Sequence, residues 1–141
     1  MRRIIRSMAL VALLGCAQAH ADDRHDALIG LWSGVDNVDG SLRTVSISDP
    51  EGDGVFTILA HDTYWSLCAG DRGIGRTTGS ADEYGIIHAA GTVKCHSGKT
   101  IDLKIDFEPI GSPAGTMLRE HVLDQPFETL VFRISVAPAR K

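Results

Sequence analysis

Three cysteines are the residues of this chain with the most definite chemistry. Cys68 and Cys95 lie well inside the chain, whereas Cys16 lies in an apolar N-terminal segment. Neither Cys68 nor Cys95 belongs to a Cys-x-x-Cys pair or lies at ligand spacing from a histidine, which argues against a zinc site and a redox-active dithiol. In an exported protein two such cysteines most often form a structural disulfide. We therefore predict a Cys68–Cys95 bond.

Histidines are the next candidates for catalysis or metal binding. His61-Asp62 and Glu120-His121 are adjacent pairs. Neighbouring residues of a strand point to opposite faces, so neither pair is a ready-made dyad. His88 lies within a predicted strand, where a lone histidine is more often a hydrogen-bonded structural group than a ligand. We predict no metal site, no cofactor and no catalytic residue, and hence a protein that is not an enzyme.

Two turn-like segments resemble ligand-binding motifs. Residues 49–54 (Asp-Pro-Glu-Gly-Asp-Gly) match the first half of a calcium loop, but the twelfth position of that loop is Ala60 instead of an acidic residue. Gly70–Gly75 resembles a phosphate-binding glycine loop, but no helix is predicted after it, so the helix N-terminus that would bind an anion is missing. We interpret both segments as solvated turns.

The elements that carry these residues are predicted strands. In Thr100–Glu108 apolar side chains alternate with polar ones, which is typical of a half-buried strand. Thr129–Val136 repeats this alternation, with Leu130, Phe132, Ile134 and Val136 on its apolar face. The other predicted strands are Ile29–Gly34, Leu42–Ser48, Gly54–His61, Thr63–Cys68, Tyr84–Cys95 and Thr116–Val122.

Turn signals separate these strands. Asp39-Gly40 and residues 96–98 suit tight hairpins, because glycine adopts positive φ without a steric penalty. The glycine-rich residues 69–83 predict a loop or a short strand, and the one predicted helix is a short turn at Asp23–Leu28. The fold class is therefore all-β, a single antiparallel meander of about eight strands. Closure into a barrel would remove the sheet edges, and a β-sandwich is the alternative that gives the same periodicity.

The first 21 residues have the layout of a bacterial secretory signal peptide. Three arginines precede the short apolar run Met8–Leu14, and residues 17–21 offer the small side chains that a signal peptidase requires. The run is too short to span a membrane. Residues 13–16 (Leu-Leu-Gly-Cys) also resemble a lipobox, so simple cleavage and lipidation of Cys16 both stay open. We predict a signal peptide at 1–21 and one β-barrel domain at 22–141, periplasmic or secreted, or lipid-anchored to the envelope.

The charge of the mature chain restricts its partners. Removal of residues 1–21 takes away three arginines and no acidic residue, which changes the net charge from −4 to −7. An acidic surface argues against nucleic acid and against anionic membrane surfaces as partners. Contact with a membrane is expected only through a lipid anchor at Cys16.

A short motif links the chain to a known architecture. Gly30-Leu31-Trp32, on the first predicted strand, resembles the Gly-x-Trp signature of lipocalin-like (calycin-type) barrels, and the resemblance covers most of residues 23–136. It implies that Trp32 closes one end of the barrel and that a basic residue late in the chain, here Arg133, packs across the indole. Small bacterial barrels of this kind include inhibitors as well as ligand carriers, so the resemblance implies a fold rather than one activity.

Three functional hypotheses follow, all of them non-catalytic. In the first, the barrel mouth holds a small apolar or amphipathic ligand, and its speculative lining is Phe56, Ile58, Trp65, Leu103, Ile105 and Phe132. A core packed without any cavity is the alternative for a barrel of this size. In the second, loops at one end, Asp49–Asp53 and Pro109–Gly115, inhibit an extracytoplasmic protease or lysozyme. In the third, the protein has only a structural role in the envelope.

Overall fold

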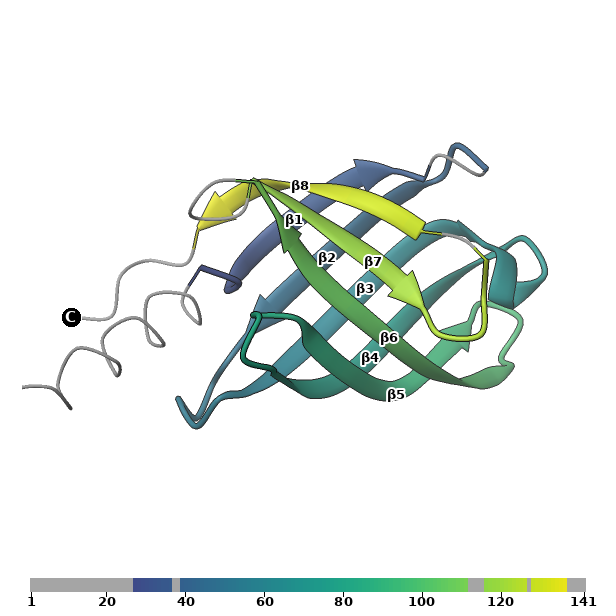
Figure 1. Ribbon diagram of the computed structural model, residues 1–141. Helices are drawn as coiled ribbons and strands as arrows, with labels where there is room; N and C mark the ends of the chain where they lie inside the picture. The colour runs from purple at the N-terminus through teal and green to yellow at the C-terminus, as the bar shows by residue number, and fades with distance from the viewer. Residues whose placement is uncertain (1–26, 37–38, 112–115, 127, 137–141) are drawn as a thin grey trace, which may run out of the picture.

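The chain folds into a closed antiparallel barrel. A computed structural model describes residues 27–36, 39–111, 116–126 and 128–136. In these residues each strand pairs with the next one, and β1 also pairs with β8, which closes the sheet (Figure 1). The predicted barrel is confirmed and the β-sandwich alternative is wrong. The strands are β1 Gly30–Val35, β2 Leu42–Ser48, β3 Val55–Trp65, β4 Asp71–Ala81, β5 Ile87–Cys95, β6 Thr100–Ile110, β7 Met117–Val122 and β8 Glu128–Val136.

Some predictions fall outside the described residues. These are the signal peptide at 1–21, the lipidation of Cys16, most of the helical turn at Asp23–Leu28, and residues 112–115 of the predicted loop Pro109–Gly115. The first two residues of that loop, Pro109 and Ile110, belong instead to the end of β6. Among the residues that are described, no helix is long and apolar enough to cross a membrane.

Strand β3 joins two predicted strands. Gly54–His61 and Thr63–Cys68 were separated by sequence pattern, but the chain continues through Asp62 with only a register shift before Trp65. The residues after Trp65 form the short 3₁₀ helix η1, Ser66–Cys68, instead of extending the strand. The break in alternation therefore marks an irregularity within one strand and not a turn.

The glycine-rich segment forms the long strand β4. Gly73 and Gly75 face the barrel interior beneath Trp65. A Cβ added at Gly73 would lie 3.1 Å from one carbon of the Trp65 ring, and a Cβ added at Gly75 would lie 2.8 Å from another carbon of the same ring. These glycines make room for a large aromatic side chain on the neighbouring strand, which is a packing requirement and not a turn requirement.

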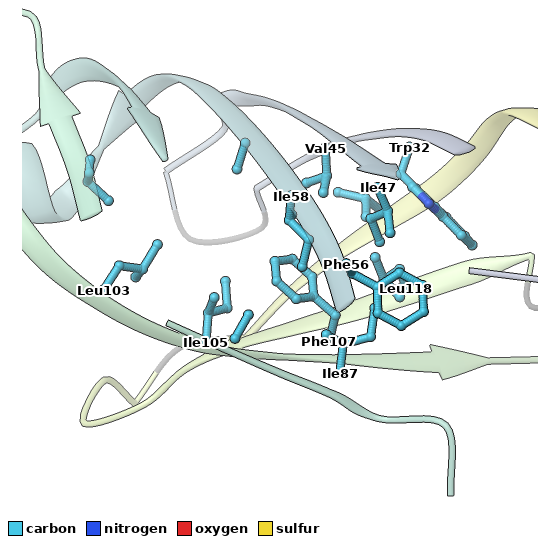
Figure 2. Close-up of a cluster of buried hydrophobic side chains, with 14 of the residues drawn as sticks. Trp32, Val45, Ile47, Phe56, Ile58, Ile87, Leu103, Ile105, Phe107 and Leu118 are labelled. Carbon is cyan, nitrogen blue, oxygen red and sulfur yellow. The ribbon is translucent and has the colours of Figure 1, made fainter. Parts of the chain in front are cut away.

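The barrel interior is filled by its own side chains. Figure 2 shows aromatic and branched aliphatic side chains converging from several strands, and Trp32, Phe56 and Phe107 are the largest that are fully buried. An eight-stranded barrel is just wide enough for such a core. The other core side chains are Leu28, Val45, Ile47, Ile58, Ala60, Trp65, Cys68, Ile87, Ala89, Val93, Cys95, Leu103, Ile105, Leu118 and Val131.

The orientation of β8 is opposite to the one that its alternation indicates. Val131 is fully buried, whereas Phe132 is 52% exposed and Ile134 lies on the same outer side. The prediction that Phe132 lines the interior is therefore wrong. The pairing with β7 gives the reason, because inward Leu118 lies opposite Val131. On the β1 side, Arg133 lies opposite Trp32, so the inward positions of β8 include a cation.

Two single substitutions test this orientation. Val131→Ala removes two buried methyl groups and is expected to lower the free energy of unfolding by about 2 kcal/mol. Phe132→Ala removes a much larger side chain but from the outer surface, and is expected to change it by less than about 1 kcal/mol. Urea denaturation of both variants measures the difference. A larger loss for Phe132→Ala than for Val131→Ala would contradict the orientation.

Each end of the barrel has a tryptophan that stacks with an arginine. Trp32 lies near the start of β1, donates its indole N–H to the Leu28 carbonyl at 3.2 Å, and carries the Arg133 guanidinium 4.3 Å from its ring centroid. Trp65 is the last residue of β3, and the Arg43 guanidinium lies 4.3 Å from its ring centroid. Because β1 and β3 run in the same direction, the two stacks mark opposite ends. The Arg133–Trp32 contact is the one that the Gly-x-Trp resemblance implies.

Candidate functional site

Most of the residues predicted to line a ligand are core residues. Phe56, Ile58, Leu103 and Ile105 are buried among one another in the barrel (Figure 2). Trp65 is buried at the end of β3, and Phe132 lies outside. The cavity at the Trp65 end measures about 40 Å³. That volume suits a few water-sized groups and is far below the several hundred Å³ of a typical ligand pocket.

A buried ionic cluster lies beneath this mouth. Arg43 of β2 donates from Nε to Glu120 Oε2 at 2.9 Å, and its Nη2 donates to the same oxygen. Its Nη1 lies 3.5 Å from Asp62 Oδ2. All three side chains are nearly inaccessible to solvent. Strands β2, β3 and β7 thus each place one charged group inside the barrel, and the one from β2, Arg43, lies over the face of Trp65.

Burial and charge act against each other in this cluster. Burial raises the pKa of Glu120, and the positive charge of Arg43 opposes that effect without cancelling it. Burial would lower the pKa of Arg43, but the carboxylates of Glu120 and Asp62 outweigh it and the pKa of Arg43 is raised. Arg43 therefore stays charged, and the ionised form of Glu120 depends on it.

The second feature is a groove on the outer surface of β3, β4 and β5. Its volume is about 690 Å³, within the range of small-molecule sites. Cross-strand pairing places Ile74 between His61 and Lys94, and Arg76 beside Thr92. The groove is lined by His61, Arg72, Gly73, Ile74, Arg76, Thr92, Lys94, Cys95, His96 and Gly98.

The groove is positively charged although the whole chain is acidic. Its described lining contains no aspartate or glutamate. Within the described part of the chain, neither Arg76 nor Lys94 forms an ion pair, and the partner of Arg72 Nη2 is the ring of His96 at 3.2 Å. Ile74, at the centre of these cations, is 55% exposed. The groove thus combines cations that lack carboxylate partners with an apolar surface.

A third cluster resembles a catalytic arrangement but differs from it in one contact. Ser80 and His88 are cross-strand neighbours on the outer surface, and His88 Nδ1 lies 2.8 Å from Asp106 Oδ1. The Nε2 atom, which would have to activate a serine, lies instead 3.2 Å from Asp82 Oδ2. The hydrogen bonds to Asp106 and Asp82 raise the pKa of His88. This geometry stabilises an imidazolium between two carboxylates.

Of the two segments that resemble ligand-binding motifs, residues 49–54 form a turn, and Gly70–Gly75 is mostly part of strand β4. Asp49 is buried, and its carboxylate accepts hydrogen bonds from the backbone N–H of Gly52 at 2.7 Å and of Gly54 at 3.3 Å. Gly70 forms the turn before β4, and the rest of Gly70–Gly75 belongs to that strand. No group of three His, Cys, Asp or Glu side chains that could hold a metal ion occurs among the described residues.

The predicted disulfide is present. The sulfur atoms of Cys68 and Cys95 are bonded, and the bridge joins η1 to the end of β5. It lies directly behind the groove, whose lining includes Cys95, and beside Trp65 at the mouth. The disulfide therefore lies next to both the outer groove and the barrel mouth at Trp65.

Comparison with known protein families, with curated proteins and with solved structures finds no match for this chain.

Proposed function

We propose that this protein is an exported, non-catalytic binding protein and that it binds its ligand in the outer groove of β3, β4 and β5. The ligand class is a small molecule that carries a phosphate, sulfate or carboxylate group next to an apolar portion. This proposal keeps the amphipathic ligand that the sequence suggested and moves it from the barrel interior to the outer surface.

The observation that carries the proposal is the charge of the groove. Arg72, Arg76 and Lys94 surround the exposed side chain of Ile74, and the described lining has no carboxylate to neutralise them. Arginine and lysine are the side chains that proteins use most often to bind anionic oxygens. An exposed isoleucine beside them provides the apolar contact that a simple inorganic anion would not need.

Two further features support the proposal. The interior is occupied by core side chains, which leaves the surface as the place for a molecule of ordinary ligand size. The Cys68–Cys95 bond is consistent with the oxidising compartment to which the proposed signal peptide would direct the chain.

Binding of 1-naphthyl phosphate, an anion with an apolar ring system, tests the groove. We expect the full mature protein to bind it and to bind the uncharged 1-naphthol much more weakly, as measured by isothermal titration calorimetry. Arg76→Glu and Lys94→Glu are each expected to weaken binding about tenfold or more, because a charge-assisted hydrogen bond is replaced by repulsion. Ile74→Ser should weaken binding of the naphthyl compound more than binding of inorganic phosphate.

The matched control is Lys104→Glu. Lys104 is exposed on β6 and outside the groove lining, so the same change in net charge should leave the affinity within about twofold. Equal effects of Lys104→Glu and Arg76→Glu would show that only overall charge matters and would refute the groove. Native mass spectrometry of protein taken from its own compartment then gives the mass of the natural ligand.

A further inference from the structure

We propose that the barrel mouth beside Trp65 is a binding site for one alkylammonium group, the cation at the tip of a lysine side chain or of a free amine. This site lies inside one end of the barrel, whereas the groove lies on the outer surface. The two proposals rest on different residues, and either can fail without the other.

Carboxylates outnumber cations at this mouth. The described residues that line its cavity include four carboxylates and one guanidinium. The guanidinium, Arg43, is already engaged with Glu120 and Asp62. The remaining carboxylates, Asp36 and Asp39, come from the turn between β1 and β2 and lie at the rim. Even without Asp36, three carboxylates of the lining, Glu120, Asp62 and Asp39, share the one guanidinium of Arg43, and this excess of negative charge would be neutralised by a cation.

The geometry of Glu120 is the second and independent indication of a ligand. Arginine commonly binds a carboxylate with one nitrogen on each oxygen. Here both Nε and Nη2 of Arg43 donate to Oε2, which leaves Oε1 without a hydrogen-bond partner among the described residues. Glu120 is only 2% exposed and lines the cavity. A buried carboxylate oxygen without a donor is unfavourable, so this position calls for a donor.

The size of the cavity restricts what that donor can be. About 40 Å³ accepts a group of the size of one or a few water molecules. An ammonium group has this size and brings three N–H donors and a positive charge. A planar ring or a fatty chain is too large. The alkyl stem of an ammonium compound would leave the cavity past Tyr64, which lines the mouth and is half exposed.

Two further carboxylates, Asp36 and Asp39, line the same cavity as Glu120. Asp36 Oδ2 accepts the Thr129 hydroxyl at 2.9 Å, which holds this carboxylate at the rim between β1 and β8. Asp39 Oδ1 accepts the backbone N–H of Ser41 at 2.9 Å, and this hydrogen bond does not use the other oxygen, Oδ2. Asp39 is thus an exposed acceptor of this cavity and Glu120 a buried one, and we propose that both accept from the ammonium group.

Calorimetric titration with n-butylammonium tests the site on the full mature protein. We expect n-butylammonium to bind and the uncharged isostere n-butanol not to bind measurably. Glu120→Gln keeps the shape and the contact with Arg43 but removes the charge, and should weaken ammonium binding at least about tenfold. The control Glu108→Gln, at a partly exposed residue of β6 that pairs with Arg119 and lies outside the cavity lining, should leave affinity within about twofold.

Asp39→Asn provides a second variant, at an exposed residue, and keeps an oxygen that can accept the Ser41 N–H. It should weaken ammonium binding by a smaller factor than Glu120→Gln, and this result decides the matter if Glu120→Gln does not fold. Equal binding of n-butanol and n-butylammonium, or no loss of affinity in either variant, would refute the site. Arg76→Glu, the groove variant, should not weaken ammonium binding, which separates this proposal from the previous one.

Two peptides identify the source of the ammonium group. Gly-Gly-Lys-Gly-Gly carries it on a lysine side chain, and its Nε-acetylated form has no charge. Tighter binding of the lysine peptide than of n-butylammonium assigns the site to a basic partner protein, whereas equal or weaker binding assigns it to a free amine. Equal binding of the acetylated and unmodified peptides would overturn the proposal.

Discussion

Replacement of Arg43 by alanine is expected to lower the free energy of unfolding by about 3–5 kcal/mol, because it leaves two buried carboxylates without their cation. Glu120 would lose both of its hydrogen bonds, and Asp62 would lose its ion pair. The stack of Arg43 on Trp65 would be lost as well. Urea denaturation followed by tryptophan fluorescence measures the change.

Two controls separate the ionic cluster from a general effect of removing an arginine. Arg119→Ala removes a partly exposed arginine that pairs with Glu108 at 2.9 Å and with Glu128 at 3.5 Å, and is expected to cost about 1 kcal/mol or less. The double variant Arg43→Met/Glu120→Leu replaces the buried pair by apolar side chains and should recover the part of the lost stability that comes from Glu120, whereas Asp62 stays without its cation. If Arg43→Ala and Arg119→Ala lowered the free energy of unfolding equally, the buried cluster would contribute no more to stability than a surface ion pair.

The pH dependence of the Arg43→Ala effect has a definite sign. The pKa of Glu120 is already raised by burial in the presence of Arg43, and loss of that cation raises it further. A carboxyl group with a raised pKa in the folded state stabilises the fold while it is protonated, and this stability is lost as the pH rises through the raised pKa. The destabilisation by Arg43→Ala should therefore be smaller in mildly acidic solution than at neutral pH.

The strands that the sequence predicts best are those whose side chains facing the barrel interior are mainly apolar and whose side chains facing solvent are mainly polar. Leu42–Ser48 was predicted with the bounds of β2, and Thr100–Glu108 lies within β6. In both, buried apolar residues alternate with polar ones that face outward, although the inner face of β2 also carries Arg43 and its first residue, Leu42, is exposed. A period of two residues follows directly from the geometry of a strand, so this inference needs no knowledge of the neighbouring strands.

The prediction failed where the requirement comes from another strand. Gly73 and Gly75 indicate a turn when β4 is considered alone, but they are inward positions beneath Trp65 of β3. In β8 the apolar face is the outer one, because Arg133 has to reach the ring of Trp32 on β1. Neither partner can be identified from the local sequence, since the contacts form only when the barrel closes.

Neither candidate site was predicted from the sequence, and the reason differs between the two. The net charge of the chain predicts an acidic surface, and an average over the whole chain does not reveal a basic groove on one part of it. Arg72, Ile74 and Arg76 recur at every second residue, and this signal would have placed them on one face had the segment been predicted as a strand. The cluster at the mouth joins Arg43 to Glu120 over 77 positions of sequence, and no short motif spans such a separation.

Loss of the Cys68–Cys95 bond is expected to lower the free energy of unfolding by about 3.5 kcal/mol. The two cysteines are 27 residues apart, and the cross-link reduces the conformational entropy of the unfolded chain by an amount that depends on this loop length. A small domain is typically stable by about 5–15 kcal/mol, so the bond supplies a large part of the total. Urea denaturation of the double variant Cys68→Ser/Cys95→Ser measures the loss.

Two comparisons show whether the bond acts on the unfolded chain or on the barrel mouth. Reduced wild-type protein should have the same stability as the double variant and a mass two hydrogens higher than the oxidised form. Because the bridge fastens η1 beside Trp65, ammonium binding at the mouth should weaken in the double variant even in conditions where it is fully folded. Unchanged ammonium binding would confine the effect of the bond to the unfolded state. Free thiols in protein isolated from the envelope would contradict the disulfide itself and remove its support for export.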